Sequence, residues 1–466
     1  MASSPNDMKP LPSAFGSVES HYWGGETVTP AKPLVELEMT RLSAALRLKP
    51  FWYTKFRDQD ILAKWRAEAL EQAEHMKESH VDYDTGAEVG CYDRIWQSDK
   101  LVTTALKAKI VEGVAKLEDV PDSEKDWHPR SNNVVLDLVH PSLYPIVYGR
   151  TLAYPARIDN RDVAKLNIIQ SPPSPGSQSW AKERSYHVSR KFQWLPTDFV
   201  VSDDGKSVKS TGYINNLHPD QHAGLHAAIE KLIGAYIPLF ERVLTDSIPS
   251  NKAVPARTKN TYSYDEGYKP EPEWKDDMND DEEEEYERLH KEWFENRPIV
   301  LPDVPSEGYV LGSLEKRSAW YSLAGKTIQV IVKLANIHLT PEKSEAIAFP
   351  NVYQHKVSPF GLKDKSKPGH RKIVALFLVD PAIQRPSTTR VPPQQQEWRA
   401  AAISSNKVLR SAFNKLAPEI IDRVNSFAEG TMTLEEAKSY RLELMEERKA
   451  FVKENDEKFF QVAFDM

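Results

Sequence analysis

Hydrophobic positions follow two different spacings along this chain, and the changes between them separate helical from strand-like regions. Apolar residues recur near every 3.6 positions in residues 34–48 and again in 51–78, which predicts two helices separated by Pro50. A third helix is predicted at 99–117, before a Pro-Asp turn. A fourth is predicted at 222–244, where one helical face collects Leu225, Ile229, Leu232, Ile233, Tyr236 and Phe240.

Short apolar runs and turn residues replace the helical spacing in residues 126–217. Breaks at His-Pro and Tyr-Pro predict short strands joined by turns. Residues 191–219 predict a β-hairpin with Asp204-Gly205 at its turn. Three further strands are predicted at 328–339, 346–357 and 371–379.

The remaining stretches are more polar. Residues 276–293 read DDMNDDEEEEYERLHKEW, a run typical of a solvated helix or loop rather than of an interaction tail. Two helices are predicted after the proline-rich residues 381–393. The second follows Thr433, whose hydroxyl can cap the helix while Glu436 completes a capping box.

Composition narrows the class of protein. The chain has 40% hydrophobic residues with 11 Trp, 18 Tyr and 16 Phe, enough for a substantial core, and 33 prolines argue against an all-helical bundle. Its single cysteine, Cys91, excludes an internal disulfide framework and is expected to be an inert buried thiol. Without a secretory signal or an apolar run of about 18 residues, we expect a cytoplasmic or nuclear protein with no membrane partner. A net charge of -7 gives no general attraction to nucleic acid, so none is expected as a partner.

Two side chains in the last predicted strands carry candidate chemistry. In 346–357, His355 shares a face with the large apolar residues; in 371–379, Arg371 heads the row that continues through Ile373. An arginine at the head of an inward-facing apolar row needs an anion or a cavity, because burying it unpaired is costly. An arginine that instead reaches solvent, or pairs with an Asp, fits the pattern equally well.

Other titratable residues have a structural interpretation beside the functional one. His338 could be a metal ligand with Glu342 or Glu345, but a core histidine is favoured. The groups Asp126-Trp127-His128 and Asp137-Leu138-Val139-His140 are expected to supply hydrogen bonds to loops, since a regular strand does not place residues three apart on one face. A polar strand end is also expected to be structural; it comprises Tyr213, Asn215, Asn216 and His218. No P-loop, GxGxxG, GxSxG, CxxC or HExxH motif occurs.

The pairing of His355 with Arg371 resembles the distal histidine and the co-substrate arginine of Fe(II)/2-oxoglutarate oxygenases. Longer blocks, in order over roughly residues 30–455, resemble a fungal family known only as domain of unknown function 4246. They are KFRDQDILAKWRAEALEQA, VLDLVHPSLYPIVYGRT, GYINNLHPDQHAGLHAAIEKLI, QVIVKLANIHLTPEK, AIAFPNVYQHKVSPF, PGHRKIVALFLVDP, VPPQQQEW and AKSYRLELMEERKAFV.

This resemblance implies a double-stranded β-helix (jelly roll) and a non-haem iron dioxygenase that uses Fe(II) and 2-oxoglutarate. His355 would bind the metal and Arg371 the co-substrate; no catalytic residue is assigned, and the substrate, a small molecule or a protein, is unknown. Such enzymes also need a His-x-Asp/Glu pair on an upstream strand, and we interpret the chain as lacking it. In the family a Gly-Gly-Ser-Trp-His-Val-Glu type segment and further barrel follow the LTPEK block, whereas here Lys343 runs almost directly into Ala346.

Three explanations of this gap remain open. The chain is an inactive binding or scaffold relative with a true internal deletion, or a truncated gene product of an active oxygenase, or it holds iron through His338, Glu342 and His355. We expect an α+β fold with an incomplete jelly roll that is open beside strand 346–357. The predicted division is a flexible leader at 1–32, a helical region at 33–120, a jelly-roll-like core at 121–400 with helical and acidic insertions at 222–322, and a helical extension at 401–466.

Overall fold

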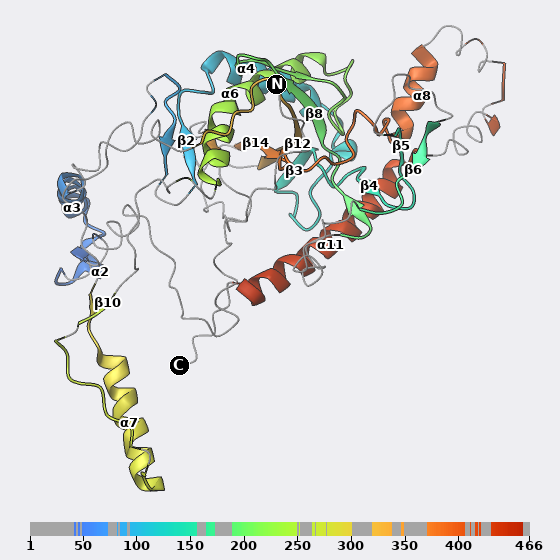
Figure 1. Ribbon diagram of the computed structural model, residues 1–466. Helices are drawn as coiled ribbons and strands as arrows, with labels where there is room; N and C mark the ends of the chain where they lie inside the picture. Colours follow the sequence, from blue (N-terminus) through green and yellow to red (C-terminus); the bar gives the residue numbers. More distant parts are fainter. Residues whose placement is uncertain are drawn as a thin grey trace.

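A central antiparallel sheet organises the protein. The computed structural model describes residues 49–72, 84–90, 94–155, 165–172, 189–248, 263–265, 267–275, 277–300, 319–337, 346–348, 371–405 and 430–459, with single residues and short pieces between them. The sheet contains the strands β3 (Val135–Val139), β8 (Thr197–Val201), β9 (Val208–Ser210), β12 (Thr327–Ile337) and β14 (Arg371–Leu378). It curls into a half-barrel (Figure 1).

β12 is the long central strand, and it pairs on both sides. β14 lies along one edge over the whole of 330–337, while β8 and β3 share the other edge, at its beginning and its end respectively. β8 continues into β9 through a turn in which Gly205 has φ +70°, which confirms the hairpin predicted around Asp204-Gly205.

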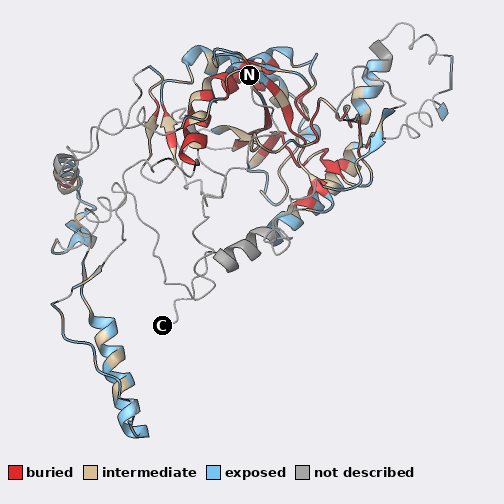
Figure 2. Ribbon diagram, viewed as in Figure 1, coloured by how far each residue is buried: buried red, intermediate tan, exposed pale blue. Residues whose placement is uncertain are grey.

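One face of the sheet packs against two helices. The side chains of Ile328, Val330, Val332 and Leu334 on β12 are almost fully buried against α6 (Ala223–Asp246) and α4 (Thr104–Glu118). The apolar stripe predicted for residues 222–244 is therefore the core-facing side of α6 (Figure 2). α4 begins five residues later than predicted, because the hydroxyl of Thr103 accepts the backbone N–H of Leu106 and caps the helix there.

The opposite face of the sheet carries the alternate side chains, and we call it the inner face. It includes Ile331, Lys333, Ala335 and Ile337 of β12, with Arg371, Ile373, Ala375 and Phe377 of β14 directly opposite them. Directly paired residues of antiparallel strands project to the same side. The row headed by Arg371 therefore lies on the inner face, as its alternation predicts.

The C-terminal helix α11 (Leu434–Phe459) crosses next to this sheet (Figure 1). Its Leu444 is buried in a small cluster with Tyr144, Val147 and Phe192. The hydroxyl of Thr433 accepts the backbone N–H of Glu436 at 3.2 Å, so the predicted cap is confirmed. The Glu436 carboxylate binds Arg150 at 2.8 Å.

Residues 263–300 form a separate arm, which stands away from the half-barrel (Figure 1). Strands β10 (Ser263–Tyr264) and β11 (Ile299–Val300) pair at the base of the arm. The helix α7 (Asp280–Asn296) lies between them in the sequence and forms much of the arm. Asn279 and Glu282 form a reciprocal capping box at the start of α7. No described residue of α7 is buried, so the acidic run is a solvated helix.

The remaining elements of the described ranges are short. They are α2 (Trp52–Lys55), α3 (Gln59–Gln72), β1 (Glu88–Val89), β2 (Trp96–Ser98), the 3₁₀ helix η4 (Asp122–Glu124), β4 (Ile146–Val147), β5 (Leu152–Ala153), β6 (Asn167–Ile168), β7 (Phe192–Gln193), β13 (Ala346–Ala348) and α8 (Gln396–Ser405). None of the helices in the described part of the chain is long and apolar enough to cross a membrane.

The expected mixed α+β class is confirmed, and the barrel is a half-barrel over the described residues. β13, the described start of the predicted strand 346–357, pairs with β2 in a separate three-stranded sheet, so the expectation that it belongs to the barrel is wrong for these residues. A complete double-stranded β-helix is not what the described strands form. Strands 328–339 and 371–379 are confirmed as β12 and β14.

Candidate metal centre

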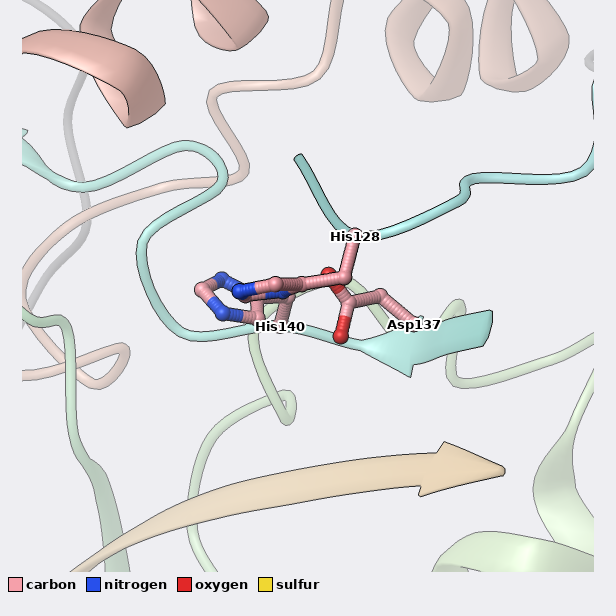
Figure 3. Close-up of side chains that lie close together, drawn as sticks. All are labelled: His128, Asp137 and His140. Carbon is pink, nitrogen blue, oxygen red and sulfur yellow. The ribbon is translucent and has the colours of Figure 1, made fainter. Parts of the chain in front are cut away.

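Three titratable side chains meet on the inner face, where β3 leaves the sheet. His128 Nδ1 lies 2.7 Å from Asp137 Oδ2, and the ring centroids of His128 and His140 are 5.2 Å apart. One nitrogen or oxygen of each residue lies within 4.8 Å of the others (Figure 3). Within the described ranges, this trio is the only group of three or more His, Cys, Asp or Glu residues close enough to hold one ion.

A β-bulge brings Asp137 and His140 to the same face. Asp137 is opposite Ala335 of β12, but Val139 is opposite Leu334, so one extra residue is accommodated in β3. After the bulge, Val139 projects into the core with α4 and α6, and the next residue, His140, projects to the inner face, as Asp137 does. The prediction that residues three apart cannot share a strand face is therefore wrong here, because the strand is not regular.

His128 reaches the same place from a neighbouring segment. Trp127 forms an isolated bridge with Leu136, and the backbone N–H of His128 donates to Val135 O at 2.8 Å. The backbone N–H of Asp137 donates to Asp126 O at 2.9 Å. Residues 126–128 thus extend the sheet beyond β3 by one short pairing, which directs His128 toward Asp137.

Amide side chains fix the turn that carries His140. The Asn216 amide donates to His140 O at 2.9 Å and to Leu143 O at 2.7 Å, and the Asn215 amide donates to Tyr144 O at 3.1 Å. Gln395 in turn donates to the side-chain oxygens of both asparagines. Asn215 and Asn216 of the polar strand end are therefore structural, as predicted, and they position His140.

The environment of His140 keeps its imidazole neutral. Burial lowers its pKa to about 2, and the charges of Lys333, His128, Arg441 and Arg448 act in the same direction. A neutral ring retains a lone pair at physiological pH, which is the form that binds metal ions.

Asp137 is the anionic member of the trio and is almost completely buried, with 1% of its side chain exposed. Its Oδ2 pairs with His128 and lies 3.8 Å from a guanidinium nitrogen of Arg441. Its Oδ1 is buried without a hydrogen-bond donor among the described groups. A buried carboxylate oxygen that lacks a donor carries a desolvation cost that a cation would offset.

Positive side chains surround the trio. Arg441 of α11 makes two hydrogen bonds to Asp126, at 2.5 and 2.9 Å, and Arg448 places its guanidinium 4.2 Å from the ring centroid of Trp194. Lys333 lies on the inner face two residues along β12 from the partner of Asp137. Asp126 pairs with Arg441, and Asp137 attracts Lys333 without forming an ion pair with it.

The residues of the trio fit a divalent ion in donor type and spacing. Two imidazoles and a carboxylate suit iron, manganese or zinc. Binding through His140 has a cost, since the backbone N–H of Ser142 donates to its Nδ1 at 3.2 Å and so places the ring proton on Nε2. The surplus positive charge adds a second condition, because a cation here is favoured only with an anion beside it.

The residues expected from the sequence lie elsewhere or outside the described ranges. Arg371 starts β14 on the inner face and is exposed; it is paired in register with Ile337, while Asp137 belongs to the next inner-face row, opposite Ala335. His355, His338, Glu342 and Glu345, like Cys91, fall outside the described residues. The trio therefore does not include any residue that the family resemblance suggested.

The chain does contain the His-x-Asp/Glu spacing, so the interpretation that it lacks one is wrong. The spacing occurs at His80-Val81-Asp82, His218-Pro219-Asp220 and His290-Lys291-Glu292. The imidazole of His218 accepts backbone N–H groups of the turn before α6, and His290 lies on the exposed arm beside Glu271. Asp82 pairs with Arg242. None of these described side chains joins the trio.

One feature of the sequence points to the site. Asp137 interrupts the apolar run of VVLDLV, where a strand buried on both faces favours apolar residues throughout. A carboxylate in such a run needs a specific partner. The bulge itself leaves no signature in the sequence.

A surface hollow of about 340 Å³ lies between α4 and α6, on the other side of the sheet from the trio. Its lining includes Lys109, Lys116, Lys231 and Glu112. It shares no residue with the trio, so the two are separate features.

The fold and the site define a mixed α+β protein with an antiparallel half-barrel and a histidine–carboxylate group on its inner face. The chain belongs to the family described as "Protein of unknown function (DUF4246)", which matches residues 61–346 and 343–402; the N-terminal domain of that family matches residues 5–68. The two matches meet at 343–346, where the family resemblance predicts a missing stretch. No curated protein and no solved structure matched the chain.

Proposed function

We propose that this protein binds a divalent transition-metal ion through His128, Asp137 and His140, and that it is an Fe(II)/2-oxoglutarate oxygenase-like protein. The observation that carries the proposal is the trio itself, with the buried Asp137 Oδ1 that lacks a donor among the described groups. Non-haem Fe(II) oxygenases hold iron with two histidines and one carboxylate, which leaves coordination positions for co-substrate and O₂. A bound metal would supply that redox chemistry.

Each residue of the trio has a separate role in this proposal. Asp137 supplies the negative charge, and the buried, neutral His140 supplies a lone pair. His128 supplies the second imidazole, and a metal ion held by both His128 and Asp137 would replace the present contact between Nδ1 and Oδ2. Arg371, on the same face of the sheet, remains the residue we assign to a carboxylate of 2-oxoglutarate.

A scaffold without metal is the competing function, and specific contacts favour it. Ser142 donates to His140, His128 contacts Asp137, and Arg441 binds Asp126. Together these contacts join the loops, β3 and α11 without any ion. In that case the trio stabilises the fold, and the protein acts by binding a partner.

Metal titration separates the two functions. Metal-free protein is titrated with Mn(II), and the free ion is measured by electron paramagnetic resonance. We expect about one ion per chain, and binding at least tenfold weaker in His140→Ala and Asp137→Asn, because each variant removes a ligand. His218→Ala, which changes a histidine outside the trio, is the control and should bind as the wild type does.

One further variant tests the assignment made from the family resemblance. His355→Gln should leave Mn(II) binding unchanged if the trio is the site. Loss of binding in His355→Gln together with retention in Asp137→Asn would move the metal away from the trio and overturn the proposal. Absence of Mn(II) binding by the wild type would favour the scaffold.

A further inference from the structure

Lys333 and Arg448 are two cations near the trio that make no ion pair and no hydrogen bond with the described residues. Lys333 is half-buried in the middle of β12, between Ile331 and Ala335 on the inner face. Burial lowers its pKa; Asp137 opposes that change and Arg448 adds to it. The pKa of the Arg448 guanidinium is also lowered by burial. The attraction of Asp137 offsets the desolvation of Lys333 only in part, since the pKa of Lys333 stays lowered, and Arg448 has no carboxylate partner among the described residues.

Lys333 occupies a position where an apolar side chain would cost less. Its neighbours on the inner face of β12 are Ile331 and Ala335, and its partner on β14 is Ala375. A lysine in such a row lowers stability unless a ligand pairs with it. Local choices that work against stability concentrate at functional positions.

Arg448 approaches the same face from α11. Its guanidinium lies 4.2 Å from the ring centroid of Trp194, and that ring lies 5.4 Å from Phe377, which belongs to the inner face. The residue as a whole is exposed, whereas burial lowers the pKa of its guanidinium. Stacking on an indole orients a guanidinium without neutralising it.

We propose that Lys333 and Arg448 form a binding site for the carboxylate or phosphate group of a small organic anion, on the inner face and beside the trio. Arg441 is not part of the site, because Asp126 already neutralises it. This anion site rests on and extends the proposed function, since a bound anion would supply the negative charge that a metal at the trio requires. It does not depend on the metal, because its two cations need a counter-ion in any case.

The test measures anion binding to the full chain in the presence of EDTA, so that failure of the metal proposal does not affect it. Succinate, 2-oxoglutarate and inorganic phosphate are titrated by calorimetry, with sodium chloride at equal ionic strength as the reference. Binding of succinate or 2-oxoglutarate would identify the anionic group as a carboxylate, and binding of inorganic phosphate would identify it as a phosphate. Thermal unfolding is recorded in parallel, since a ligand that binds the native state raises Tm with its concentration.

The wild type should bind at least one of these anions, and binding should weaken at least tenfold in Lys333→Met and in Arg448→Gln. Without anion, Lys333→Met should unfold at a higher temperature than the wild type, because it removes a half-buried cation that has no ion pair. The matched control is Lys326→Met, which changes a half-buried lysine that contacts Tyr321 before β12. It should retain anion binding. Wild-type protein that responds to no anion beyond the chloride reference, or a Lys333→Met variant that binds as the wild type does, would overturn the inference.

Discussion

Charged side chains that are buried with a partner contrast with Lys333 and Arg448, and Glu230 of α6 is the clearest example. Its carboxylate accepts hydrogen bonds from the Lys209 ammonium at 2.7 Å and from the backbone and hydroxyl of Ser210 at 3.0 and 2.9 Å. Burial alone would raise its pKa, but these hydrogen bonds outweigh burial and the pKa is lowered. A carboxyl whose pKa is lower in the folded state stabilises the fold above its unfolded pKa of about 4.3.

Glu230→Gln should therefore lower the free energy of unfolding by about 1–2 kcal/mol at pH 7. The expected loss is small because Lys209 is mostly exposed and solvent screens its attraction to Glu230. The difference from the wild type should shrink as the pH falls through the folded pKa, where the wild-type carboxyl also becomes protonated. Urea unfolding at pH 7 and at pH 3 measures both. Glu285→Gln, on the exposed arm, is the control and should leave stability nearly unchanged; a Glu230→Gln effect that is the same at both pH values would contradict this account.

At the residue scale, sequence alternation was enough to place Arg371 but not His140. Arg371 lies in a regular strand, so its face follows from counting by two. His140 follows a bulge, whose position depends on how β3 pairs with β12, two strands about 190 residues apart. Long-range pairing of this kind cannot be read from the local pattern.

At the scale of elements, the contact between α4 and α6 depends on a glycine. A Cβ at Gly113 would lie 2.8 Å from Leu225 Cβ and 3.2 Å from Leu225 Cα, so the two helices approach closely because position 113 has no side chain. At Gly224, in the first turn of α6, a Cβ would meet no atom within 4 Å. The two positions form a matched pair, since both are helical glycines.

Gly113→Ala should destabilise the protein by about 1–3 kcal/mol, because overpacking between the helices outweighs the gain in helix propensity. Gly224→Ala should be neutral or stabilising, by up to about 1 kcal/mol. Urea unfolding of the two variants beside the wild type checks the prediction. Equal stability of the two variants would show that α4 and α6 do not pack as closely as described.

The helices and the long strands were the elements that the sequence predicted best. α4, α6, β12 and β14 have long periodic patterns, and their ends differ from the predicted ones mainly where a cap such as Thr103 intervenes. The two-residue strands β4 to β7 have no periodicity to detect, and their pairing depends on the fold around them.

At the scale of the whole molecule, the arm of residues 263–300 is separable from the half-barrel. The side-chain contacts described for α7 are within the arm itself, for example Trp293 Nε1 to Lys269 O at 2.7 Å and Trp274 against Tyr286. Replacing residues 266–296 by a short Gly-Ser turn should therefore change Tm by less than about 2 °C. Differential scanning calorimetry measures it, and a drop several times larger would show that the arm stabilises the body.

The mixed α+β class was predicted from the sequence, but the site was not. The described strands form an open half-barrel, and the two family matches meet at residues 343–346. The trio could not be predicted from the resemblance, because the resemblance assigns site roles only to His355 and Arg371. His128, Asp137 and His140 come together only once β3, its bulge and the segment before it are placed in the sheet.

The central claim is that His128, Asp137 and His140 hold a metal ion, and anomalous diffraction tests it most directly. Crystals of the protein are soaked in Mn(II), and the anomalous map is calculated near the manganese edge. The account predicts one strong peak at about 2.0–2.3 Å from a nitrogen of each histidine and an oxygen of Asp137. An empty trio, with His128 still hydrogen-bonded to Asp137, would contradict it.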